Sequence, residues 1–251
     1  MITPLFLLPS VFFISLVLTM VGLGGGLVFS PLFVLLHMPT PIAVSASLFL
    51  NGIAAASAAA VYYRKRMIDF SISLPLLVTS SVAAPAGAFV TAKVDIQHFL
   101  GIMGCVILLA GLRMFFSPVT QSETLNVSRR KKILWGGILG LGVGFMGGLL
   151  GIGGGVFVVP ALIYALKVPT RTAAASSIFI VCFSSLTGFV THASLGNIDW
   201  PFVLLAGLFS FAGGYAGSRI MSEKLKAKPI RMIFGVILLL LSARIFLRAF
   251  F

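Results

Sequence analysis

The sequence contains very few charged residues. Only 9% of its 251 residues are Asp, Glu, Lys or Arg, whereas an ordinary soluble domain carries about 25%. The first 63 residues contain none of the four. Because 59% of the residues are apolar, too little polar surface remains for a soluble enzyme, a disordered protein or a nucleic-acid-binding protein. The composition therefore indicates a membrane protein that crosses the bilayer several times.

Acidic residues and cysteines are scarcer still, with five and two residues respectively. Cation and proton carriers typically place carboxylates at mid-membrane. All five carboxylates fall in predicted loops or at helix ends, which argues against a metal-ion carrier but leaves sodium binding by unwound carbonyls open. Cys105 and Cys182 lie inside apolar stretches, so neither a disulfide framework nor a metal site is expected. The acidic residues are Asp69, Asp95, Glu123, Asp199 and Glu223.

Two of the eight apolar segments are too long for a single span of roughly 20 residues. Each is interrupted by glycines, in Gly22-Leu-Gly-Gly-Gly26 and in Gly151-Ile-Gly-Gly-Gly155. Glycine in a helix interior costs about 1 kcal/mol relative to Ala, so each long segment is expected to form two helices joined at its glycines. The segments are 3–36, 41–63, 71–92, 97–116, 133–166, 172–192, 200–221 and 230–248.

The basic residues indicate how the long segments meet the membrane. If each crosses once, the basic clusters divide between the two sides. If each leaves and returns as a hairpin, fifteen of the 18 Lys and Arg fall on one side, which is typical of cytoplasmic loops. We therefore predict hairpins, with both termini outside and loops 64–69, 117–132 and 222–229 inside. The three remaining basic residues are Lys93, Arg244 and Arg248.

An internal repeat relates the two halves at a near-constant offset of 129–130 residues. Besides the glycine motifs, the matches include Pro39-Thr40 with Pro169-Thr170, Ile68-Asp69-Phe70 with Ile198-Asp199-Trp200, and Ala86-Gly87 with Ala216-Gly217. Each half holds one hairpin and three spans, an odd number of crossings, so the halves are predicted to be inverted in the membrane.

The predicted fold is an all-α polytopic membrane protein of two inverted repeats, each a glycine-broken helical hairpin plus three transmembrane spans, with about ten helices in all. We expect a first membrane repeat over 1–116, a cytoplasmic linker over 117–132 and a second repeat over 133–251. Inverted repeats with discontinuous helices are typical of secondary transporters, whose substrate sites lie where the broken helices meet. The spans contain no nucleophile, carboxylate pair or metal cluster, so neither enzyme activity nor a cofactor is expected. An anion channel is the alternative.

The glycine turns are the predicted binding site. Each precedes a helix expected to start near Leu27 or Val156, and a helix N-terminus offers unsatisfied N–H groups and partial positive charge to an anion. Two inverted copies would aim both helix ends at one region near the midplane. The alternative is that the glycines only permit tight helix packing. The predicted binding residues are Gly24, Gly25, Gly26, Gly153, Gly154 and Gly155.

Side chains on the following spans could complete an anion site. Ser47 and Asn51 are four residues apart and share a helix face, and Ser177 is the counterpart of Ser47 in the second half. Their hydroxyl and amide groups donate hydrogen bonds without adding charge. The alternative is hydrogen bonding between packed helices.

Two further candidates are Arg171, which could attract substrate at the cytoplasmic mouth, and His192, which could couple transport to protons because imidazole titrates near neutral pH. Arg171 is otherwise an ordinary charge of the cytoplasmic side. Asp69 and Asp199 precede apolar runs and are predicted to be helix N-caps.

The doubled pattern G-x-G-G-G-x4-P, together with Gly213-Gly-Tyr-Ala-Gly217, resembles the sulfite exporter TauE/SafE family, also called the toluenesulfonate uptake permease family. The resemblance covers nearly the whole chain. It implies a carrier in a bacterial or archaeal plasma (inner) membrane, and it implies export of small sulfur-containing anions such as sulfite or organosulfonates. Another small anion, or uptake rather than export, stays open. The expected partners are the anion, a coupling proton or sodium ion and membrane lipid, and no nucleic acid.

Overall fold

The computed structural model describes residues 7–91, 93–116, 129–166, 168–196, 198–223 and 228–250, and every regular element in these ranges is a helix. Residues 117–128 of the predicted linker lie outside the described residues, as do Glu123, Lys167, Lys224 and Lys226. The elements are α1 (Leu7–Val21), α2 (Gly26–Leu35), α3 (Thr40–Arg64), α4 (Phe70–Thr91), α5 (Ile96–Phe116), α6 (Arg129–Leu150), α7 (Gly155–Pro160), the π-helix η1 (Ala161–Ala165), α8 (Thr170–Ser194), α9 (Trp200–Ser222) and α10 (Lys228–Phe250).

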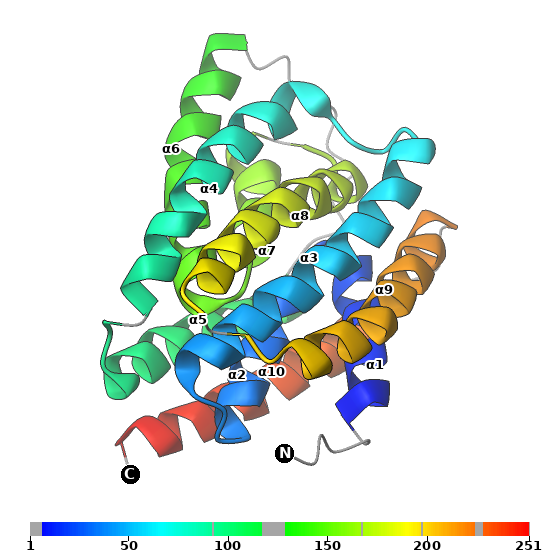
Figure 1. Cartoon of the computed structure of the whole chain (residues 1–251). Helices are drawn as coiled ribbons and strands as arrows, with labels where there is room; N and C mark the ends of the chain where they lie inside the picture. Colours follow the sequence, from blue (N-terminus) through cyan, green and yellow to red (C-terminus); the bar gives the residue numbers. More distant parts are fainter. Residues whose placement is uncertain are drawn as a thin grey trace.

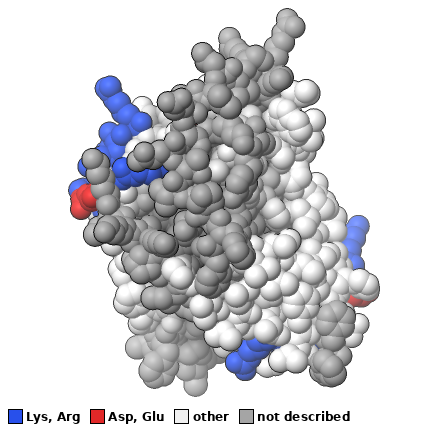
Figure 2. Space-filling view, turned by 180° about the vertical axis from the view of Figure 1, so that it is seen from behind, with Lys and Arg blue, Asp and Glu red and all other residues white. Residues whose placement is uncertain are grey.

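The helices suit a membrane by length and composition. In the described ranges, α3, α4, α8 and α9 are long and apolar enough to span a bilayer, and shorter apolar stretches occupy α1, α2, α5 and α6. Figure 2 views the molecule from behind. On the face it shows, the Lys and Arg side chains lie near the edges, and most gather at one corner. The coarse prediction of a helical multi-pass membrane protein is therefore confirmed.

Both long apolar segments break into two helices at their glycines, as predicted. The first forms α1 and α2, and the second forms α6 and the continuous helical stretch of α7 and η1. The helices after the turns begin at Gly26 and Gly155, one residue before the predicted starts. In Figure 1, α1 starts at the lower edge and α10 ends there, whereas α3 ends and α6 begins at the upper end.

The helix pairings between the two halves come in sets related by the sequence repeat. Helix α1 packs along α9, and its counterpart α6 packs along α4. Likewise α3 contacts α9, and its counterpart α8 contacts α4. The matching helices α3 and α8 pack against each other in the middle of the bundle, and α5 packs against α10 across its lower part (Figure 1). Each of these contacts joins one half to the other.

Glycines allow close approach in the helix pairs α1–α9 and α4–α6. A Cβ on Gly217 of α9 would collide with the carbonyl oxygen of Leu16 on α1, and a Cβ on Gly87 of α4 would collide with that of Phe145 on α6. The two contacts are related by the offset of the sequence repeat. Small residues of this kind let helix backbones pack together within a bilayer, where apolar side chains gain little from leaving lipid.

The aspartates of the repeated Ile-Asp-Phe and Ile-Asp-Trp segments act as helix N-caps, as predicted. The Asp69 carboxylate accepts a hydrogen bond from the backbone N–H of Ser71 at 2.9 Å, at the start of α4. The Asp199 carboxylate accepts one from the N–H of Phe202 at 3.3 Å, at the start of α9. Each satisfies a donor that the first turn of a helix leaves without an intrahelical partner.

Candidate functional site: the paired glycine turns

The two glycine turns lie directly against each other. A Cβ on Gly26 would lie 2.7 Å from the carbonyl oxygen of Gly151 and 2.8 Å from that of Ile152. In the reciprocal contact, a Cβ on Gly155 would collide with the carbonyl oxygen of Leu23. Glycine at these two positions is therefore what lets the start of each helix touch the turn before the other.

The turns require glycine for their backbone shape as well. Gly22 and Gly24 have φ values of 84° and 70°, and Gly151 and Gly153 at the matching positions have 74° and 72°. Residues with a side chain pay roughly 1–2 kcal/mol in this left-handed region. The motifs therefore encode the same reversal twice.

The backbone conformations of the two turns differ at the residue before each helix. Gly25 has a right-handed helical φ of −79° and ψ of −23°, whereas Gly154 is left-handed at φ 86° and ψ −8°. The two turns are therefore alike in sequence and unlike in conformation at one position.

One face of α3 covers the second turn. Val44, Ser47 and Asn51 are spaced by three and four residues and so share this face. A Cβ on Gly151 would lie 3.1 Å from Val44 Cα, and the Ser47 hydroxyl donates to the Gly151 carbonyl oxygen at 2.7 Å.

The equivalent face of α8 covers the first turn. A Cβ on Gly22 would crowd Ala174, and one on Gly24 would lie 3.2 Å from Cγ1 of Val181. Ser177 lies between these residues on the same face, and it is fully buried. Its hydroxyl makes no hydrogen bond to any described residue. Unlike Ser47, Ser177 thus leaves an unused donor beside its turn.

Asn51 contacts both turns. Its Oδ1 lies beside Gly24 and its Nδ2 beside Gly153, at the points where a Cβ on either glycine would be. The Nδ2 group donates to Ser185 Oγ at 2.8 Å and to the Ile152 carbonyl oxygen at 3.3 Å. Within the described residues, Oδ1 accepts no hydrogen bond. The amide therefore lies at the junction of the two turns.

Carbonyl oxygens at the second turn already accept hydrogen bonds from side chains. Besides the contacts of Ser47 and Asn51, Ser30 donates to the carbonyl of Leu150 at 2.6 Å, and Ser184 donates to that of Gly153 at 2.9 Å. Ser30 was not anticipated, although its place four residues after Gly26, on the same face of α2, was a usable signal.

Backbone N–H groups at the starts of the two following helices, in contrast, lack acceptors. Among the described residues, no hydrogen bond is made by the N–H groups of Gly26 and Leu27 at the start of α2, or of Gly155 and Val156 at the start of α7. These are the donors that a helix leaves unpaired at its N-terminus. The carbonyl oxygens of the second turn are therefore occupied, whereas the N–H donors at the starts of both helices are not.

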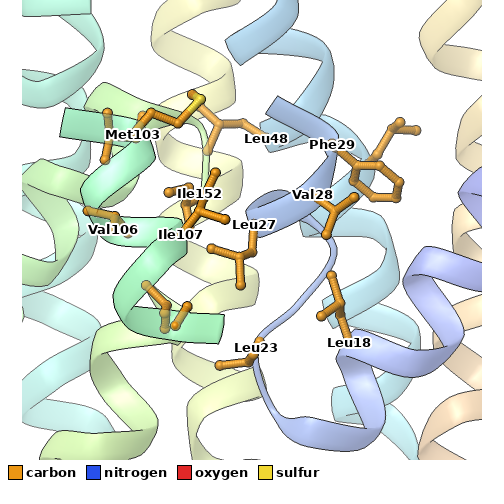
Figure 3. Packing of buried hydrophobic residues seen from close by; sticks show 14 of the residues in the cluster. Leu18, Leu23, Leu27, Val28, Phe29, Leu48, Met103, Val106, Ile107 and Ile152 are labelled. Atoms are coloured by element: carbon orange, nitrogen blue, oxygen red, sulfur yellow. The ribbon is translucent and has the colours of Figure 1, made fainter. Parts of the chain in front are cut away.

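The opposite face of the turns is apolar. Figure 3 shows Leu23, Leu27 and Ile152 grouped beside Val106 and Ile107 of α5, and all five side chains are buried. No Asp, Glu, Lys or Arg is buried anywhere in the described part of the chain, and it holds no group of three metal-ligating side chains.

The remaining two candidates have other surroundings. The Arg171 guanidinium donates to the carbonyl oxygens of Met221 and Ser222, at 2.8 and 3.1 Å, at the end of α9. His192 is fully buried in the last turns of α8, and neither ring nitrogen hydrogen-bonds to a described residue. The structure therefore brings together the six glycines, Ser47, Asn51 and Ser177, and leaves Arg171 outside this group.

Cross-paired apolar helices around a centre of two broken helices define a multi-pass helical membrane protein. The model of the sulfite exporter TauE/SafE family matches residues 7–245, and the chain belongs to this family.

Relatives of similar length carry transporter names. A Bacillus subtilis (strain 168) protein named "Probable membrane transporter protein YunE" is 27% identical, over 93% of each chain. A "Probable membrane transporter protein" of Xylella fastidiosa (strain 9a5c) is 25% identical, over 94% of this chain and 92% of its own. No solved structure matches. The family and these names place the chain among membrane transporters.

Proposed function

We propose that the protein is a secondary transporter of a small sulfur-containing anion, such as sulfite or an organosulfonate, in a bacterial or archaeal plasma membrane. The anion binds between the two glycine turns, and the direction is export. The single observation that carries this proposal is an imbalance where the turns meet: the carbonyl oxygens of Gly151 and Ile152 are occupied by Ser47 and Asn51, while the first N–H groups of α2 and α7 are unpaired.

This imbalance favours an anion over a cation. A sodium site would use free carbonyl oxygens or a carboxylate, and at the second turn the carbonyls of Gly151 and Ile152 already accept hydrogen bonds. The buried Ser177 hydroxyl supplies a further unused donor. An oxyanion offers several acceptors to such donors, and its charge is favoured at a helix N-terminus.

The recurrence of helix pairings supports two inverted repeats. The pairings of α9 with α1 and α3 have counterparts in the pairings of α4 with α6 and α8, as a two-fold axis between the halves requires. In this arrangement both hairpins turn near the midplane, both termini lie outside, and the basic loops lie inside in accordance with the charge distribution.

Direct contact between the turns supports a carrier rather than a channel. With Gly26 against Gly151 and Gly155 against Leu23, no pore passes between the turns, so an ion reaches the unpaired N–H groups only when they separate. No role as an enzyme is proposed, because the buried polar residues are Ser, Thr, Asn and His without a carboxylate in the described ranges.

Counterflow in proteoliposomes tests the function. Proteoliposomes that contain the purified protein are loaded with sulfite, thiosulfate, sulfoacetate, taurine, sulfate or chloride. Exchange of a labelled sulfur anion is then measured. We expect saturable exchange of at least one sulfur-containing anion and little exchange of chloride. Absence of exchange for all sulfur anions, or a flux too fast to show counterflow, contradicts the proposal.

The location of the site is tested by Asn51→Asp, which keeps the size of the side chain and adds a negative charge between the turns. Anion exchange should fall at least about tenfold, the effect of about 1.4 kcal/mol of repulsion. Gln97→Glu makes the same chemical change on an exposed residue of α5 and should leave exchange unchanged. Wild-type exchange by a folded Asn51→Asp protein would exclude this site.

A further inference from the structure

A cavity of about 400 Å³ lies between α3 and α9. Most of its walls are small or apolar side chains, whereas one end carries cations. The transport proposal makes no use of this cavity. It is lined by Ala56, Ser57, Ala60, Val61, Arg64, Lys65, Phe211, Tyr215 and Arg219.

The cationic end is formed by the last residues of both helices. Arg64 and Lys65 end α3 and are exposed. Arg219, in the last turn of α9, donates to the Tyr215 hydroxyl from Nε at 3.1 Å and from Nη2 at 2.6 Å. No ion pair joins any of these three cations to a carboxylate within the described ranges. Three positive charges at one end of the cavity thus lack counter-ions.

The apolar end extends along both helices. Ala56 and Ala60 precede Arg64 at intervals of four residues, so the wall of α3 runs about 12 Å along the helix axis. On α9, the Phe211 side chain is 52% exposed. The hydroxyl of Ser57 donates to the carbonyl oxygen of Phe211 at 3.0 Å and closes the floor. The cavity is therefore a groove on the outer surface.

The geometry points to a binding site for an anionic phospholipid. Its phosphate lies between Arg64, Lys65 and Arg219, and one acyl chain follows Ala60 and Phe211. A multi-pass membrane protein is surrounded by phospholipid, and basic side chains near the membrane surface attract anionic headgroups. A free inorganic anion would leave the apolar walls uncovered, whereas a phospholipid matches the charged end and the apolar end together.

Native mass spectrometry of the full chain tests the site, with phosphatidylglycerol and phosphatidylcholine of equal chain length. Wild-type protein should retain phosphatidylglycerol in preference. The double variant Arg64→Gln, Arg219→Gln should bind phosphatidylglycerol about 30-fold more weakly, given the attraction of each cation near the surface. Lys93→Gln removes an exposed cation from the α4–α5 connection and should bind like wild type.

A further variant, Ala60→Trp, fills the apolar end and leaves the cations in place, and it should also lower phosphatidylglycerol retention. Equal retention of the two lipids by wild-type protein overturns the proposal, and this comparison needs no variant to fold. A loss in Lys93→Gln as large as in the double variant also overturns it, as does glycerol 3-phosphate binding as tightly as phosphatidylglycerol. Anion counterflow is measured separately, so failure here leaves the transport proposal standing.

Discussion

Asn51 and Val181 occupy matching positions on α3 and α8, and each lies against both glycine turns. A Cβ on Gly24 or on Gly153 would lie 3.2 Å from Val181 Cγ1, and either would collide with the Asn51 amide. The centre is therefore flanked by a hydrogen-bonding side chain on one side and an apolar side chain on the other. Whatever binds between the turns meets two different walls, although the turns repeat in sequence.

The serine pair should separate stability from binding. Ser47→Ala removes the donor to the Gly151 carbonyl and should destabilise the protein by about 0.6 kcal/mol, the average for hydrogen bonds between membrane helices, and by at most about 1.7 kcal/mol. Ser177→Ala removes a hydroxyl that has no partner among the described residues, so stability should stay the same while anion affinity falls. Thermal unfolding in detergent and counterflow are measured on both variants. Equal destabilisation by both substitutions would contradict this assignment.

The turn glycines should tolerate alanine poorly. Gly24→Ala and Gly153→Ala place a methyl group in left-handed backbone and against the Asn51 amide. Gly196→Ala is the matched control, because Gly196 has φ 76° and nothing within 4 Å of its Cβ position. The control should lose only the backbone cost of roughly 1–2 kcal/mol, and the turn variants should lose more. If Gly24→Ala and Gly153→Ala unfold at midpoints no lower than that of Gly196→Ala, the turns can move away from the Asn51 amide without loss of stability, and the prediction is wrong.

Helix pairing should depend on the close approach at Gly217. Gly217→Leu forces a side chain against the Leu16 carbonyl, and overpacking of this kind typically costs about 1–3 kcal/mol. Gly142→Leu, at an exposed site on α6 with nothing within 4 Å, should not destabilise the protein. The yield of monodisperse protein in size-exclusion chromatography compares the two.

The orientation in the membrane is tested by cysteine labelling in intact cells. The background carries Cys105→Ser, because Cys105 is exposed and Cys182 is buried. The charge distribution predicts that a membrane-impermeant maleimide labels Asp95→Cys and not Lys65→Cys. The reverse pattern would invert the predicted topology, and labelling of both would show a mixed population.

Much of this arrangement could be predicted from local sequence. The breaks at Gly22–Gly26 and Gly151–Gly155 followed from segment length and helix propensity. The caps at Asp69 and Asp199 followed from their place before apolar runs. The shared face of Ser47 and Asn51 followed from helical periodicity. Each of these depends on interactions within a few residues, which the sequence states directly.

The rest depends on contacts between distant segments. Hydropathy cannot predict that α1 packs against α9, because it does not distinguish the faces of an apolar helix. Only the small residues that permit close approach mark the interface. The acceptors of Arg171 belong to α9, some 50 residues further on. Gly25 and Gly154 occupy the same place in one motif, so sequence could not show that their backbones differ.

The pairing of α1 with α9 also constrains the order of events during synthesis. About 200 residues separate the end of α1 from the end of α9, and at about 5–20 residues per second a ribosome needs roughly 10–40 s to make them. For most of this interval, until the second turn at residues 151–155 and then α8 have been made, the first turn has neither of them beside it. Lipid supplies no hydrogen-bonding partner to an open backbone, so the nascent hairpin stays at the water interface or against insertion machinery until the second half arrives.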